Sequence, residues 1–77
     1  MSPDRLSHMA NQIGKFFAHQ GHDKAVAGIE DHLRKFWDRR MRVGILDAVD
    51  RGEAQLDPLV AEAIERLRAP AAAVSAG

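Results

Sequence analysis

The chain lacks the residues on which several kinds of site depend. It contains no Cys, so it offers neither disulfides nor thiolate ligands for zinc or an iron–sulfur cluster. Its formal net charge is zero, whereas a general nucleic-acid binder needs excess cations to neutralise phosphates. No apolar run approaches the ~20 residues of a membrane-spanning helix, and the N-terminus does not resemble a secretion signal. The absence of a membrane span and of a secretion signal predicts a cytoplasmic protein that does not bind membranes, and the balanced charge argues against a general nucleic-acid binder.

The length of the chain limits the core that it can build. At 77 residues it forms one small domain, and a chain of this size buries only about 60% of its unfolded surface. Without Cys, no disulfide supplements that core. Two alternatives follow: a helical domain of marginal stability that folds alone, or one whose burial is completed by a partner or by a second copy in a homodimer.

Apolar residues recur at helical spacing in four segments, and strand patterns are nearly absent. The four stripes comprise Leu6, Met9, Ala10, Ile13, Phe16 and Phe17; Val26, Ile29, Leu33, Phe36 and Trp37; Met41, Ile45, Leu46, Ala48 and Val49; and Leu59, Val60, Ala63, Ile64 and Leu67. The pattern predicts an all-α fold, a small bundle of about four helices over residues 1–69.

Capping residues mark where these helices begin and end. Ser2, Asp23, Asp38 and Asp57 are expected N-caps, and Pro follows two of them at the first helical position. Gly21 and Gly52 are expected helix stops. The Ala- and Pro-rich segment 70–77 is predicted to be a disordered, flexible tail.

The first two helices repeat one arrangement. Apolar positions 6, 9, 13, 16 and 17 recur twenty residues later at 26, 29, 33, 36 and 37. Two similar helices joined by a short turn are expected to pack as an antiparallel hairpin. Gly14, Gly28 and Gly44 lie inside predicted helices, where Gly costs ~1 kcal/mol relative to Ala. Either these glycines mark places where two helices approach closely, or the helices simply tolerate the cost of Gly at these positions.

No group of residues forms a recognisable catalytic or metal site. The Asp residues at helix starts are explained by capping, and no Ser has a base beside it in a recognisable constellation. The four His residues are not joined by Cys or by well-spaced carboxylates. We therefore predict no catalytic, cofactor-binding or metal-binding residue in this chain.

Segment 29–42 is the strongest candidate for a binding surface. It holds the only Trp and five of the eleven Lys and Arg residues. Trp and Arg dominate interface energetics, and guanidinium groups pair with carboxylates in a bidentate manner. Two alternatives remain for Trp37, an interface anchor or a core residue, and a basic cluster can also be a solvated face.

Two blocks of the chain carry a family resemblance, residues 9–17, MANQIGKFF, and residues 32–42, HLRKFWDRRMR, with a weaker echo at 56–60, LDPLV. They resemble the delta subunit of soluble, NAD-dependent, molybdenum-containing formate dehydrogenases. The resemblance implies a non-catalytic accessory subunit that binds the catalytic subunit and supports assembly or stability of the complex. The partner subunits are expected to carry molybdopterin guanine dinucleotide, iron–sulfur clusters, FMN and NAD.

The predicted partner-binding residues combine this resemblance with the composition of the basic segment. They are Asn11, Gln12, Arg34, Phe36, Trp37, Arg39, Arg40, Met41 and Arg42. Two other functions are kept as alternatives: a transient chaperone for cofactor insertion into the catalytic subunit, and a small nucleic-acid-binding regulator that uses the basic segment.

Overall fold

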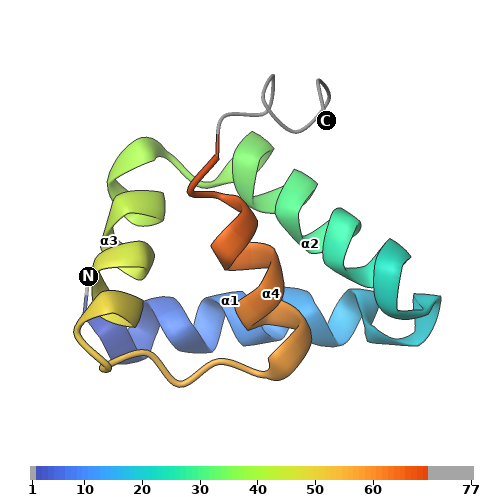
Figure 1. The fold of residues 1–77 in the computed structure, drawn as a ribbon, viewed down its shortest axis with the longest axis horizontal. Coiled ribbons are helices and arrows are strands. Elements are labelled where there is room, and N and C mark those ends of the chain that lie inside the picture. The colour runs from blue at the N-terminus through green and yellow to red at the C-terminus, as the bar shows by residue number, and fades with distance from the viewer. Residues whose placement is uncertain (1, 70–77) are drawn as a thin grey trace.

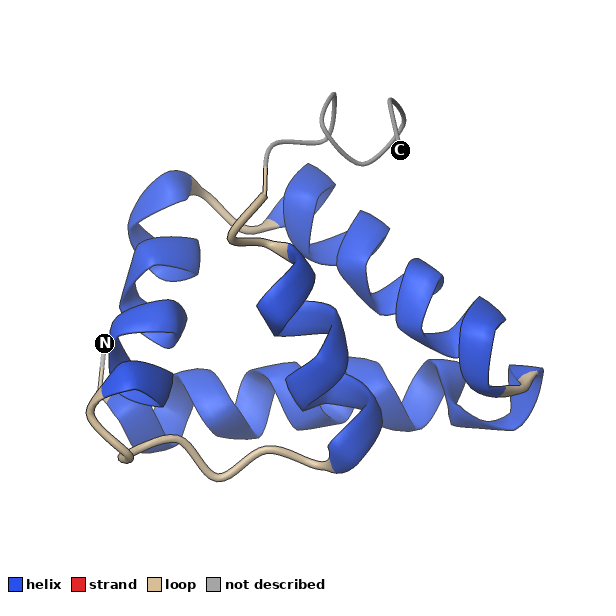
Figure 2. Ribbon diagram, in the orientation of Figure 1, coloured by secondary structure: helices blue, strands red, loops and turns tan. Residues whose placement is uncertain are grey.

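Four α-helices make up the fold of residues 2–69, which are the residues that this computed structural model describes (Figures 1 and 2). They are α1 (Pro3–Phe17), α2 (His22–Phe36), α3 (Arg39–Asp50) and α4 (Pro58–Arg66), with a short 3-10 helix, η1 (Ala18–Gln20), after α1. No strand occurs in these residues, so the predicted all-α class is confirmed. The predicted flexible tail, 70–77, lies outside the described residues.

Most helix boundaries follow from the capping residues. The side chain of Ser2 accepts a hydrogen bond from the Arg5 amide, and that of Asp38 accepts one from the Met41 amide. These contacts satisfy amide groups that have no partner within the helix. Asp57 occupies the N-cap position of α4, although its side chain makes no capping hydrogen bond.

The start of α2 differs from the prediction. Gly21 rather than Asp23 is the N-cap, and Asp23 is the second residue of the helix. The backbone of Gly21 has a φ of 92°, which suits a residue without a Cβ. The chain therefore reverses direction at Gly21 and enters α2 at once, and the Gly21 carbonyl accepts a hydrogen bond from the Ala25 amide at 2.8 Å.

After this turn, α2 runs back from the end of α1, but the two helices splay apart (Figure 1). Helix α4 packs mainly against α2 and also contacts α1, so it fills the opening on one side. Helix α3 packs against α1 near the N-terminus (Figure 1). None of these helices has the length and apolar character that crossing a bilayer requires.

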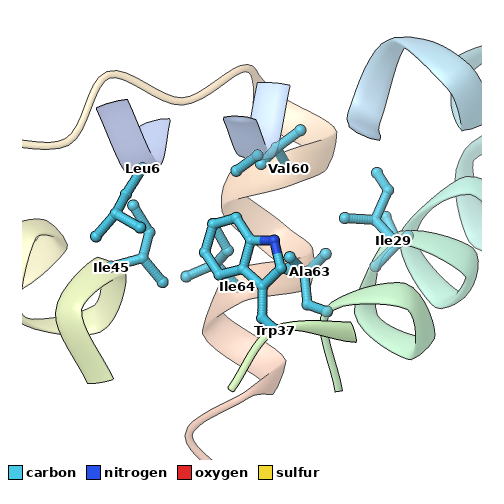
Figure 3. Close-up of a cluster of buried hydrophobic side chains, with 10 residues drawn as sticks. Leu6, Ile29, Trp37, Ile45, Val60, Ala63 and Ile64 are labelled. Atoms are coloured by element: carbon cyan, nitrogen blue, oxygen red, sulfur yellow. The ribbon is translucent and has the colours of Figure 1, made fainter. Parts of the chain in front are cut away.

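The core draws on all four helices and is centred near Trp37, which is only 6% exposed. Figure 3 shows its indole against α4, with Leu6 and Ile45 to one side and Ile29 to the other. Of the two alternatives for Trp37, the structure supports the core residue.

The helical glycines mark close approaches between elements. A Cβ on Gly14 would overlap the Val60 side chain, and one on Gly28 would lie 2.6 Å from the Phe17 ring. A Cβ on Gly44 would lie 3.0 Å from Leu6. The interpretation as close helix approach is therefore confirmed over simple tolerance.

Candidate partner-binding surface

Two phenylalanines lie on the surface although the helical pattern placed them in core stripes. Phe16 is 73% exposed and Phe36 is 71% exposed. They occupy equivalent positions, twenty residues apart, near the C-terminal ends of α1 and α2. The neighbouring stripe residues behave differently, because Trp37 is part of the core and Phe17 packs against it. The expectation that Phe16 faces the core is therefore wrong, whereas Phe36 was also a predicted partner-binding residue.

The exposed rings belong to a row of aromatic side chains that joins α1 to α2. Ring centroids lie 5.4 Å apart for Phe16 and Phe17, 6.4 Å for Phe17 and His32, and 4.7 Å for His32 and Phe36. The first two pairs meet edge to face, an arrangement worth about 0.5–1.5 kcal/mol beyond area burial. The row is therefore held in place by its own contacts.

A groove of about 340 Å³ runs beside this row. Its lining residues are Gln12, Ile13, Phe16, Phe17 and His32. We call these five residues together with Phe36 the aromatic surface. The ring of Phe17 can approach α2 only because position 28 is Gly, since a Cβ there would overlap the ring. A groove with these walls suits the apolar side chains of a partner.

The opposite face of the α1–α2 pair is already covered by α4. Gly14 of α1 contacts Val60 of α4. Glu30 of α2 lies 3.7 Å from the Arg66 guanidinium of α4. Helix α4 thus closes one face of the pair, and the aromatic surface is the other face.

A second hollow, of about 320 Å³, lies where α1 meets the start of α3. It is lined by Leu6, Asp38, Arg40, Met41 and Gly44. Arg39 and Arg40 are exposed, and neither forms an ion pair with any other residue in the described range. The positive charge at the start of α3 is therefore available to an external carboxylate.

Three of the predicted partner-binding residues serve the fold instead. Trp37 is part of the core. The Asn11 side chain donates to the Gln55 carbonyl at 2.9 Å and accepts from the Asp57 amide at 3.0 Å, which holds the loop before α4 against α1.

Arg34 is the third residue with an internal role. Its guanidinium donates to the carbonyls of Arg66 and Ala69 at 2.9 and 2.8 Å, and pairs with Glu30 at 2.9 Å. Carbonyls at a helix C-terminus lack partners within the helix, so Arg34 caps the end of α4. Its guanidinium points into the molecule rather than toward a partner.

The other predicted residues divide between the two hollows and the remaining surface. Gln12 and Phe36 belong to the aromatic surface, and Arg40 and Met41 line the second hollow. Arg42 is half-buried, and its Nε atom is buried with no hydrogen-bond partner among the described residues. The charged cluster therefore does not act as one patch.

The His and acidic side chains in the part of the chain that the structure describes do not gather into a cluster of metal ligands. Within residues 2–69, no three His, Cys, Asp or Glu side chains lie close enough to hold an ion. His22 pairs with Glu62 at 2.9 Å, and His32 lies in the aromatic row.

The family model for the NADH-dependent formate dehydrogenase delta subunit, FdsD, matches residues 5–64. The chain belongs to this family. Comparisons with curated proteins and with solved structures gave no match. The stretch matched to the delta-subunit family runs from the first turn of α1 into α4 and contains the whole aromatic surface.

Four residues of the aromatic surface of this delta-subunit family member were not predicted from the sequence as surface residues: Ile13, Phe16, Phe17 and His32. The twenty-residue repeat carried the relevant signal, because it placed Phe16 in the same environment as Phe36. That repeat does not show which face of the α1–α2 pair is covered by α4, and the position of α4 decides which residues of the stripes are exposed.

Proposed function

We propose that this chain is a non-catalytic accessory subunit of a formate dehydrogenase. It binds the molybdenum-bearing catalytic subunit through the aromatic surface and supports the assembly or stability of the complex. The observation that carries the proposal is the pair of exposed rings, Phe16 and Phe36, beside an apolar groove in a member of the delta-subunit family.

The energetics favour a partner for this surface. Burying a Phe side chain that was exposed contributes about 1.5–3 kcal/mol, so Phe16 and Phe36 together supply about 3–6 kcal/mol. Association costs on the order of 4–15 kcal/mol in lost translational and rotational freedom. Further contacts are therefore needed, and they are provided by the groove and by Arg40, which has no ion-pair partner among residues 2–69.

The redox chemistry is assigned to the partner subunits in this proposal. They would hold molybdopterin guanine dinucleotide, iron–sulfur clusters, FMN and NAD. This chain contains no Cys and offers no thiolate to a cluster or to molybdenum. Its contribution to activity is through binding and stabilising those subunits.

The test is recovery of the tagged chain from its native host grown on formate. Molybdenum content and formate–NAD activity are measured in the eluate. Active, molybdenum-loaded enzyme in a constant ratio to this chain supports a resident subunit. If this chain is recovered with the immature catalytic subunit alone, it acts as a transient chaperone rather than as a resident subunit. If neither the active enzyme nor the immature subunit is recovered, the proposal is overturned.

Matched variants assign the binding to the surface. Phe36→Ser is expected to reduce recovery of the partner, whereas Val43→Ser is expected to leave it unchanged. Val43 is a suitable control because it is also an exposed apolar residue, 55% exposed, but lies on α3 outside the aromatic surface. Equal recovery with both variants would rule out the aromatic surface as the binding site.

A further inference from the structure

The aromatic surface and the second hollow lie along the same helix. Leu6 lines the second hollow and Ile13 lines the groove of the aromatic surface. Half-buried Met9 lies between them, three or four residues from each, so helical geometry places all three on one side of α1. One partner segment running along α1 would reach from Phe16 to Arg40.

We infer that this surface receives an amphipathic α-helix of the partner, whose apolar stripe is flanked by carboxylates. The helix would lie on the face of the α1–α2 pair opposite α4. This inference rests on the proposed function and deepens it by stating the chemistry of the docked segment.

The shape of the surface favours a helix over an extended peptide. A peptide that binds by strand addition gains affinity by pairing with an exposed strand edge, and residues 2–69 contain no strand. The groove of about 340 Å³ is roughly twice the volume of a cavity of about 150 Å³ that takes benzene. It therefore suits two or more apolar side chains, which a helix presents three or four residues apart.

The charges favour an acidic helix. Arg40 lines the second hollow without a carboxylate partner among the described residues. Arg5 is exposed four residues before Met9 on the same side of α1, and it too makes no ion pair within residues 2–69. The carboxylate of Asp38 accepts a hydrogen bond at the start of α3.

The same charges disfavour a second copy of this chain as the occupant. A two-fold symmetric interface presents the same patch from both subunits. Arg5 and Arg40 of one copy would then meet a surface carrying the same cations. A carboxylate-flanked helix avoids this repulsion and gains charge-assisted hydrogen bonds.

The experiment is photo-crosslinking in the full chain within the purified complex. A benzophenone amino acid replaces Phe16, Phe36 or, as a control, Glu65, which is exposed on α4, and crosslinked peptides are identified by mass spectrometry. The inference expects positions 16 and 36 to label one partner segment at residues three, four or seven apart, with Asp or Glu among them. Position 65 is expected to leave that segment unlabelled.

Charge variants test the second half of the inference. Arg40→Glu is expected to weaken binding at least about 10-fold, and Arg40→Lys to retain most of it, because the cation is preserved. Labels at alternate residues, labels on a second copy, or equal binding by the two Arg40 variants would overturn the inference. Labels at alternate residues and equal binding by the two Arg40 variants leave the proposed function standing if the complex is recovered, whereas labels on a second copy also remove the aromatic surface as the site that binds the catalytic subunit. If no complex is recovered, the proposed function fails and the inference fails with it.

Discussion

Substitutions at the adjacent residues Phe36 and Trp37 are predicted to have different effects, one on partner binding and the other on the stability of the fold. Phe36 is 71% exposed and Trp37 is 6% exposed. We expect Trp37→Ala to reduce the stability of the fold strongly and Phe36→Ser to leave it nearly unchanged. For binding to the partner, Phe36→Ser is expected to reduce affinity while the variant remains folded.

The magnitudes follow from the burial of each ring. A buried Trp removes roughly 150–250 Å² from water, which at ~25 cal/mol per Å² corresponds to about 4–6 kcal/mol. Measured Trp→Ala changes in cores are about 3–5 kcal/mol. A domain of 77 residues has about 4–12 kcal/mol of stability in total. Trp37→Ala thus removes much of it, whereas an exposed substitution such as Phe36→Ser changes it by about 0.5 kcal/mol or less.

The assay is urea and thermal unfolding followed by circular dichroism at the helix band, which does not depend on the Trp itself. A loss of 3 kcal/mol or more corresponds to a fall in Tm of at least about 12 °C, since ~1 kcal/mol shifts Tm by about 4–8 °C at this size. Binding of folded Phe36→Ser is expected to weaken about 30-fold, or ~2 kcal/mol, if the ring is a hot spot. Similar losses of stability in both variants, or a Trp37→Ala variant with native stability, would refute the reasoning.

Three further predictions concern the fold. Gly14→Ala is expected to destabilise the domain by about 1–2 kcal/mol in urea unfolding despite a helix-propensity gain of ~1 kcal/mol, because the new methyl group overlaps buried Val60. Because Val60→Ala removes the overlapping atoms, the two changes together should cost less than the sum of their separate losses, and a stabilised single variant contradicts the overlap. Asp38→Ala should cost about 1 kcal/mol by removing the N-cap of α3, whereas Asp38→Asn, which keeps an acceptor, should retain most of the stability. Hydrogen bonds from Arg68 hold the pKa of Asp50 below its ordinary value of 3.8. The stability that this ion pair adds to the fold is therefore present above that pH and is lost as the pH falls through the folded-state pKa. Arg68→Gln should therefore weaken the acid dependence of unfolding, and an unchanged pH profile excludes the coupling.

The secondary structure was largely readable from the amino-acid pattern because its causes are local. Apolar spacing predicted four helices, and capping predicted the starts at Pro3, Arg39 and Pro58. The error at Asp23 arose because two adjacent signals competed there. Gly21 allowed a sharper turn than an Asp cap requires, so α2 begins at His22. The family resemblance was equally accessible, since the sequence blocks that carry it lie within the matched residues.

Only part of the candidate surface was predictable. Gln12, Phe36 and Arg40 were identified from the sequence and are exposed in the structure. Asn11 was predicted to bind a partner because it lies off the apolar stripe and within the block that resembles the family, and Arg34 because it belongs to the basic segment. Their actual partners are the loop before α4 and the end of α4, at least 32 residues away along the chain, and helical periodicity contains no information about contacts at such a distance.

The sequence by itself determined the helical class, most helix boundaries and family membership, because each depends on neighbouring residues or on the matched segment as a whole. The tertiary structure alone decided which ends of the apolar stripes are covered. Phe16 and Phe36 share the pattern of buried residues, yet α4 covers only one face of the splayed α1–α2 pair. Exposure depends on where other helices lie in space, and the packing angle set by contacts such as Gly14 against Val60 and Gly28 against Phe17 leaves these two rings uncovered.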